Sequence, residues 1–142
     1  MLTEIQFNHY LDRHNLSFEA RDYLTRVRNQ QASRMVGVHA KTNISSWFYS
    51  EKMGRTISTE SYSVERAFVV INEYNNSVFE LWDQPEPVPI KKYYKKGVGR
   101  TSWYTPDFIV YKDSGPVVIE VKDRTTVICE QEKSPRNWVV EP

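Results

Sequence analysis

The sequence predicts a single domain of the α/β or α+β class, in which a central mixed β-sheet is flanked by helices. Two patterns support this class. Apolar residues recur at helical spacing in segments before residue 74, and segments rich in β-branched and aromatic residues follow as far as residue 121. A length of 142 residues and a hydrophobic content of 39% suit one domain with a moderate core.

Two helices are predicted at the N-terminal end. Thr3 and Gln6 have the spacing of a capping box, and the residues around them predict a helix over about 4–14. Ser17 can cap a second helix over about 18–31. The side chains of this helix expected to face inward are Phe18, Tyr23, Leu24 and Val27. The two helices form an N-terminal helical extension.

Residues 32–58 lack strong periodicity and are polar and punctuated by glycine, which predicts a long loop or arm. We therefore divide the chain into N-terminal helices with a basic arm, residues 1–58, and a core, residues 59–142. Both parts are expected to belong to one compact domain.

Basic residues gather in two segments, 26–55 and 91–100, although the net charge of the chain is only +1. Such segments fit local contact with a polyanion such as DNA. A solvated charged loop explains either segment alone about equally well. The candidate DNA-binding residues are Lys41, Lys52, Arg55, Lys91, Lys95, Lys96 and Arg100.

A third helix is predicted over about 62–73, after the capping residue Ser61. Its apolar stripe is expected to comprise Val64, Phe68 and Ile71. Glu65 lies in the first turn, on the flank of this stripe. A glutamate in the first turn often complements the helix dipole. The functional interpretation is that Glu65 faces the hairpin predicted over residues 108–121.

Strands are predicted over residues 78–82, 88–94, 108–111 and 117–121. The last two flank a turn-rich connector, Lys112–Pro116, and therefore form a β-hairpin. Gln84 follows the first strand and precedes Pro85. It is a candidate for the edge of a site, with turn geometry as its structural alternative.

Polar side chains meet at one end of this hairpin. Asp107 precedes its first strand, while Glu120 and Lys122 lie near the end of its second and share a face, because side chains alternate along a strand. Two carboxylates and an ammonium are costly to bury there without a function. Carboxylates hold Mg²⁺, for which Mn²⁺ can substitute, and this suits phosphodiester hydrolysis. The alternative is a surface ion pair between Glu120 and Lys122.

Pro106–Asp107 and, further on, Glu120–Val121–Lys122 resemble the PD-(D/E)xK nuclease motif. The surrounding pattern is more specific, because four stretches occur in order: Ser61–Phe68, Asp83–Pro85, Tyr104–Val110 and Val118–Lys122. Together, residues 50–123 resemble the N-terminal catalytic domain of TnsA, the endonuclease subunit of heteromeric cut-and-paste transposases. The C-terminal helix expected after the hairpin is not evident.

The resemblance implies a restriction-endonuclease-like fold and a cytoplasmic bacterial protein, associated with the nucleoid during transposition. It implies metal-dependent cleavage of double-stranded DNA at transposon ends, on the strand that is not joined to the target. The implied partners are a TnsB-like transposase and a TnsC-like ATPase regulator.

The resemblance also assigns roles to residues. The implied catalytic residues are Glu65, Asp107, Glu120 and Lys122. The implied metal ligands are Glu65, Asp107, Glu120 and the backbone carbonyl of Val121. Lys122 is expected to stabilise charge in the transition state or to orient the nucleophile.

Three other interpretations fit the sequence. A stand-alone restriction or repair nuclease would use the same chemistry without a partner. A catalytically silent nuclease-fold domain would bind DNA or serve assembly, and a plain structural domain would use Glu120 and Lys122 as a surface pair. Cys129 is the only cysteine, so no internal disulfide or cysteine metal cluster is expected, and no run is long enough for a membrane span.

Overall fold

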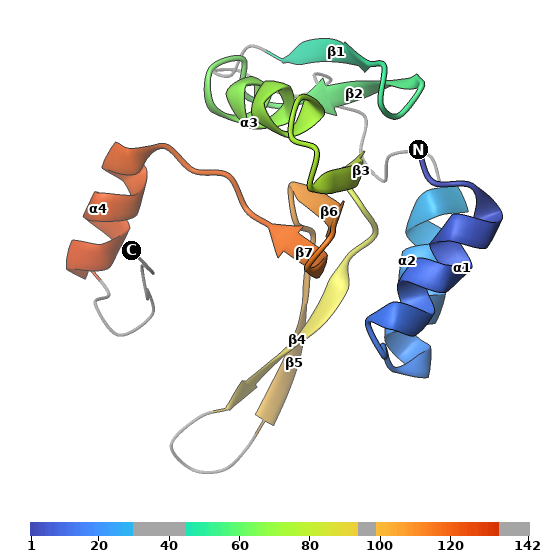
Figure 1. Cartoon of the computed structure of the whole chain (residues 1–142). Helices are drawn as coiled ribbons and strands as arrows, with labels where there is room; N and C mark the ends of the chain where they lie inside the picture. Colours follow the sequence, from blue (N-terminus) through green and yellow to red (C-terminus); the bar gives the residue numbers. More distant parts are fainter. Residues whose placement is uncertain (30–44, 94–98, 134–142) are drawn as a thin grey trace.

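The structure, a computed structural model, describes residues 1–29, 45–93 and 99–133, with only the backbone described for residues 91–93. Its helices are α1 (Glu4–Arg13), α2 (Phe18–Asn29), α3 (Val64–Glu73) and α4 (Arg124–Lys133). Its strands are β1 (Ser46–Ser50), β2 (Arg55–Thr59), β3 (Val78–Asp83), β4 (Val88–Tyr93), β5 (Gly99–Tyr104), β6 (Phe108–Lys112) and β7 (Gly115–Ile119), as Figure 1 shows. This small domain of helices and sheets agrees with the predicted α/β or α+β class.

The strands form antiparallel sheets rather than one mixed sheet. β3, β6 and β7 form a three-stranded sheet in the order β3-β6-β7, while β1 pairs with β2 and β4 pairs with β5. Every pairing among the described residues is antiparallel, so the prediction of a mixed sheet is wrong for this part of the chain. A parallel pair needs a crossover of about a dozen residues or more, whereas a tight turn joins β6 to β7.

The three-stranded sheet is built around β6. Its residues from Phe108 to Tyr111 are at most 2% exposed, because this central strand is covered on both faces. Full burial explains why β6 reads as a continuous apolar run. β7 begins at Gly115, whose φ of +120° favours glycine, and ends at Ile119, earlier than predicted. Glu120 and Lys122 therefore lie just beyond the strand.

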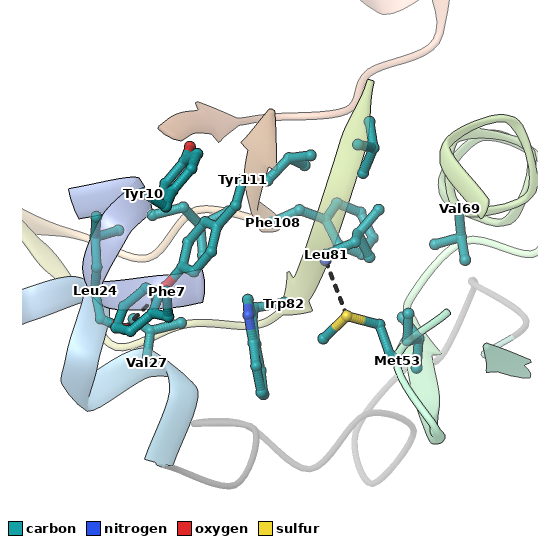
Figure 2. Packing of buried hydrophobic residues seen from close by; sticks show 14 of the residues in the cluster. Phe7, Tyr10, Leu24, Val27, Met53, Val69, Leu81, Trp82, Phe108 and Tyr111 are labelled. Atoms are coloured by element: carbon teal, nitrogen blue, oxygen red, sulfur yellow. Dashed lines mark hydrogen bonds between the residues drawn. The ribbon is translucent and has the colours of Figure 1, made fainter. Parts of the chain in front are cut away.

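The N-terminal helices are part of the main core. Phe7 of α1 stacks on Tyr111 of β6 with ring centroids 5.8 Å apart, and the Tyr111 hydroxyl donates to the Leu24 carbonyl of α2 at 2.9 Å. Figure 2 shows these helices and the sheet contributing to one cluster. Buried residues on both sides of the predicted division at residue 58 thus form one core.

The inward face of α2 differs from the prediction in one residue. Leu24 and Val27 are buried as expected, whereas Phe18 is 82% exposed. At 3.6 residues per turn, Phe18 lies on the side of the helix opposite Val27. The prediction that Phe18 faces inward is therefore wrong.

Residues 46–59 form a β-hairpin, β1 and β2, where a loop or arm was predicted. The pattern is hard to detect because aromatic residues occupy both faces of β1. Trp47 and Tyr49 are each 63% exposed, whereas Phe48 between them packs against the core. Ile57 of β2 and Met53 of the turn are buried, and Figure 2 shows the Met53 sulfur accepting the Leu81 N–H of β3 at 3.3 Å.

α3 buries a different face from the predicted stripe. Glu65, Val69 and Asn72 are buried, while Ile71 is 68% exposed. The buried residues follow the i, i+4, i+7 spacing of one helix face, and a glutamate occupies the first of these positions. The prediction for Ile71 is wrong because the helix turns Glu65 toward the sheet.

α4 follows the three-stranded sheet, although residues 124–133 show no clear helical pattern in the sequence. The Asp123 carboxylate accepts the Thr126 N–H at 2.9 Å at the start of the helix. None of the α4 residues is buried, and in Figure 1 the helix stands apart from the sheets. Across the ranges that the structure describes, no helix is both long and apolar enough to span a membrane.

Candidate active site

Asp107 is fixed at the open end of the β6–β7 hairpin. Its N–H donates at 3.1 Å to the carbonyl of Ile119, the residue that also pairs with Phe108. Its carboxylate oxygen Oδ2 accepts the Val121 N–H at 2.8 Å. The backbone on both strands therefore positions this carboxylate directly.

Gln84 lies beside Asp107 at the end of β3. Its N–H donates to the Asp107 carbonyl at 2.9 Å, and its side chain is fully buried. Its φ is +45°, a left-handed conformation that costs free energy for a residue other than glycine. Gln84 thus occupies the predicted edge of the site and also shapes the turn before Pro85.

Glu120 and Lys122, two exposed residues just beyond β7, form an ion pair next to Asp107, as the surface-pair alternative expects. The Lys122 Nζ lies 3.1 Å from the Glu120 Oε1, and the Tyr104 hydroxyl donates to the Glu120 Oε2. The pKa of Lys122 is raised, chiefly by its hydrogen bond to Glu120 and further by negative charges that include Asp107. Lys122 is therefore held protonated among the carboxylates.

Glu65 reaches this end of the sheet from the first turn of α3. It is only 7% exposed, and its carboxylate accepts the Glu60 N–H at 2.8 Å. Burial raises the pKa of Glu65 to about 7, and the charges of Asp107 and Glu60 act in the same direction. The predicted catalytic residues thus interact electrostatically at one place, although they come from separate elements.

The carboxylates fit a divalent cation in part. Oxygen donors of this kind are those that Mg²⁺ prefers, and a cation would offset the repulsion between Glu65 and Asp107. Among the described residues, however, no three histidine, cysteine, aspartate or glutamate side chains form a group that could hold a metal ion. The Glu120 carboxylate contacts Tyr104 and Lys122 rather than joining Glu65 and Asp107.

Two predicted DNA-binding residues make structural contacts. The Lys52 Nζ donates to the carbonyls of Asn72 and Asn75 at 2.8 Å each, at the C-terminal end of α3. Burial lowers the pKa of Lys52. Arg55 forms an ion pair with Asp83 at 2.9 Å, and its guanidinium lies 5.0 Å from the centre of the Trp82 ring.

The remaining DNA-binding candidates are placed unevenly. Arg100 is exposed on β5, and Lys91 lies on β4, where only its backbone is described. Lys41, Lys95 and Lys96 lie outside the described residues. Arg100 is thus the candidate with a described side chain that is open to solvent.

Sequence reasoning assigned no role to Tyr104, although it begins the stretch that contains Asp107. Its hydroxyl contact with Glu120 arises from the path of β5, which was not predicted as a strand. The available signal was the run Thr101–Tyr104, in which threonine, tryptophan and tyrosine are residues enriched in strands.

Comparisons with known proteins identify no family for this chain. No protein-family model matches the sequence, and no curated protein matches it significantly.

Proposed function

We propose that the chain is a metal-dependent DNA endonuclease that hydrolyses a phosphodiester bond. The observation that carries this proposal is the burial of Glu65 beside Asp107. These carboxylates come from a helix and a strand end far apart in the sequence, and the pKa of Glu65 is raised to about 7. Carboxylates held together at such a cost are characteristic of functional sites.

In this proposal, Glu65 and Asp107 would hold Mg²⁺, and Glu120 would be the third carboxylate once it left its contacts with Tyr104 and Lys122. The bound cation supplies polarisation of the scissile phosphate. Lys122 stays protonated through Glu120 and Asp107, and it donates to a phosphate oxygen on which negative charge develops. The Val121 N–H keeps the Asp107 carboxylate oriented.

We further propose the restriction-endonuclease-like fold and the TnsA-like role. The sequence stretches that carry the resemblance supply Glu65, Gln84, Asp107 and Glu120, which lie at one end of the three-stranded sheet. The substrate would then be the strand at a transposon end that is not joined to the target. A TnsB-like transposase and a TnsC-like ATPase would be the partners of this cytoplasmic protein.

One observation favours a second candidate, a catalytically silent module that binds DNA or serves assembly. Glu120 is held by Lys122 and Tyr104, and no three metal-binding side chains are grouped in the described part of the chain. A silent module would keep its contacts with DNA and show no metal-dependent cleavage.

The test is nicking of supercoiled plasmid with Mg²⁺ or Mn²⁺, with and without a cognate transposase. The key variant is Asp107→Asn, which keeps an oxygen acceptor for the Val121 N–H. The matched control is Asp113→Asn, at the opposite end of the same hairpin, where the carboxylate is 56% exposed. We expect metal-dependent nicking by the wild type and the control, and none by Asp107→Asn.

Each alternative has its own outcome in this experiment. Cleavage that needs the transposase supports the TnsA-like role, whereas cleavage without it indicates a stand-alone nuclease. Retained cleavage by Asp107→Asn would refute the site, and DNA binding without any cleavage would favour the silent module.

A further inference from the structure

The Glu120 carboxylate has both of its oxygens engaged on the side of β5. The Tyr104 hydroxyl donates to Oε2, and the Lys122 Nζ lies 3.1 Å from Oε1. The Glu120 side chain is about one-third exposed, so it has room to take another orientation.

Backbone contacts bring the Asp107 carboxylate next to Glu120. Phe108 pairs with Ile119, and the Asp107 N–H donates to the same residue rather than to Glu120, so the strand pairing is irregular at this end. The Asp107 Oδ2 accepts the N–H of Val121, the residue that follows Glu120. The two carboxylates are therefore close along the backbone, although the Glu120 side chain is directed toward Tyr104 and Lys122.

We propose that Tyr104 restrains Glu120 and thereby keeps the carboxylate site incomplete until Arg100 of β5 engages DNA. This inference rests on the proposed endonuclease function and adds its regulation. When the Tyr104 hydroxyl withdraws, Glu120 is free to join Asp107 and Glu65. The restraint accounts for the lack of a three-carboxylate group among the residues that the structure describes.

The β4–β5 hairpin is suited to this coupling. In Figure 1 it projects away from the three-stranded sheet, and Tyr104 is the last residue of β5, where the hairpin returns to the sheet. Arg100 and Tyr104 share one face of β5, because side chains alternate along the strand. Arg100 is exposed on this face, so a polyanion that binds Arg100 acts on the strand that carries Tyr104.

The test measures Mn²⁺ binding by titration calorimetry, without DNA, for the wild type and for Tyr104→Phe. Removing the hydroxyl frees the Glu120 Oε2 at no loss of ring volume and leaves the exposed pair with Lys122, so Tyr104→Phe is expected to bind Mn²⁺ on the order of tenfold more tightly. Tyr74→Phe is the matched control, because this tyrosine is 80% exposed and lies at the C-terminal end of α3, whereas Glu65 lies in the first turn of that helix. The gain must disappear when Tyr104→Phe is combined with Glu120→Gln.

A second arm adds a short DNA duplex, with Ca²⁺ in place of Mn²⁺ so that binding is measured without cleavage. DNA is expected to tighten Ca²⁺ binding more in the wild type than in Tyr104→Phe, because the variant has already lost the restraint. Arg100→Ala is expected to reduce the gain seen in the wild type.

The outcomes separate this inference from the proposed function. Unchanged or weaker Mn²⁺ binding by Tyr104→Phe would overturn the restraint, and weaker binding would show that Tyr104 positions Glu120 for the ion. If the wild type binds Mn²⁺ and Asp107→Asn does not, the proposed metal site stands whatever Tyr104 does. If no variant binds either ion, with or without DNA, both proposals fail.

Discussion

Glu80 and Glu65 are both buried glutamates of this domain, yet their surroundings are opposite. Glu80 is fully buried and accepts hydrogen bonds from Arg28 at 3.0 and 3.1 Å, from the Trp82 Nε1 at 2.9 Å and from the Leu2 N–H at 2.9 Å. Glu65 accepts the Glu60 N–H, and the charges that act on it are negative.

The difference separates a structural carboxylate from a candidate functional one. At Glu80, a cation and several hydrogen-bond donors compensate the buried charge. The contacts of Glu80 with Arg28 and Leu2 connect the N-terminal helical segment to β3. At Glu65, burial is not compensated in this way, so the charged form costs free energy until a cation or a proton arrives. The following changes test this contrast.

The largest expected effect comes from Arg28→Met, which leaves Glu80 buried without its cation. We expect the free energy of unfolding to fall by about 3–5 kcal/mol. Urea denaturation at neutral pH measures it. The double variant Arg28→Met/Glu80→Leu is expected to recover much of this loss. A loss below about 1 kcal/mol for Arg28→Met would show that the pair has little structural role.

Glu65→Gln is expected to act in the opposite direction and to depend on pH. The pKa of Glu65 is raised from 4.5 to about 7 by burial, so the folded state is favoured below pH 4.5 and loses this advantage as pH rises through 7. With a chelator present, Glu65→Gln should therefore exceed the wild type in stability by about 2–3 kcal/mol at pH 8.

The stability difference between Glu65→Gln and the wild type should shrink toward pH 4.5, where the wild-type carboxyl is protonated in the folded state and about half protonated in the unfolded state. Denaturation at pH 4.5 and at pH 8 gives the comparison. Equal differences at both pH values would show that the Glu65 carboxyl does not titrate abnormally.

A divalent cation should stabilise the wild type and not Asp107→Asn. At a Mg²⁺ concentration ten times the dissociation constant, the expected gain is about 1.4 kcal/mol. Thermal denaturation with Mg²⁺ and then with excess chelator measures this gain and its reversal. An equal gain in Asp107→Asn would place the cation elsewhere.

Asp83 is an intermediate case between Glu80 and Glu65. It is 3% exposed and accepts the Ser58 N–H at 2.9 Å, while its partner Arg55 is partly open to solvent. Asp83→Asn keeps one oxygen acceptor, so we expect a loss of about 1 kcal/mol by denaturation. A loss as large as that of Arg28→Met would mean that solvent exposure of the arginine does not weaken its ion pair.

Arg13→Met should have the smallest effect. Its ion pair with Asp113 is 3.0 Å long, but the two side chains are 63% and 56% exposed. Solvent screens such a pair, and a change within about 0.5 kcal/mol is expected. A larger change would point to packing of the Arg13 side chain rather than to its charge.

Features that depend on the residues of one short segment are predicted correctly from the sequence. The Thr3–Gln6 capping box is present at the start of α1, with Thr3 accepting the Gln6 N–H at 3.2 Å. The β6–β7 hairpin was predicted from its two apolar runs and the turn between them. These features depend on neighbours in sequence, so composition and spacing suffice.

Other features depended on contacts between distant segments. Glu80 is an ordinary polar residue in the sequence of β3, and its ion pair with Arg28 requires α2 to pack beside that strand. Lys52 and Arg55 are predicted to bind DNA. In the structure, Lys52 donates to a carbonyl at the end of α3 and Arg55 forms an ion pair with Asp83. β1 was missed because its aromatic residues do not alternate with polar ones.

Residue spacing along the chain is enough to predict the helices α1, α2 and α3, the central hairpin, and the grouping of Asp107, Glu120 and Lys122 at its end. The antiparallel pairing of the sheets, the inward direction of Glu65, and the contact of Tyr104 with Glu120 follow from tertiary packing. Helix spacing and strand alternation are local properties. The rotation of a helix against a sheet, by contrast, is set by the packing of the whole core, and so are the charges that come to lie side by side.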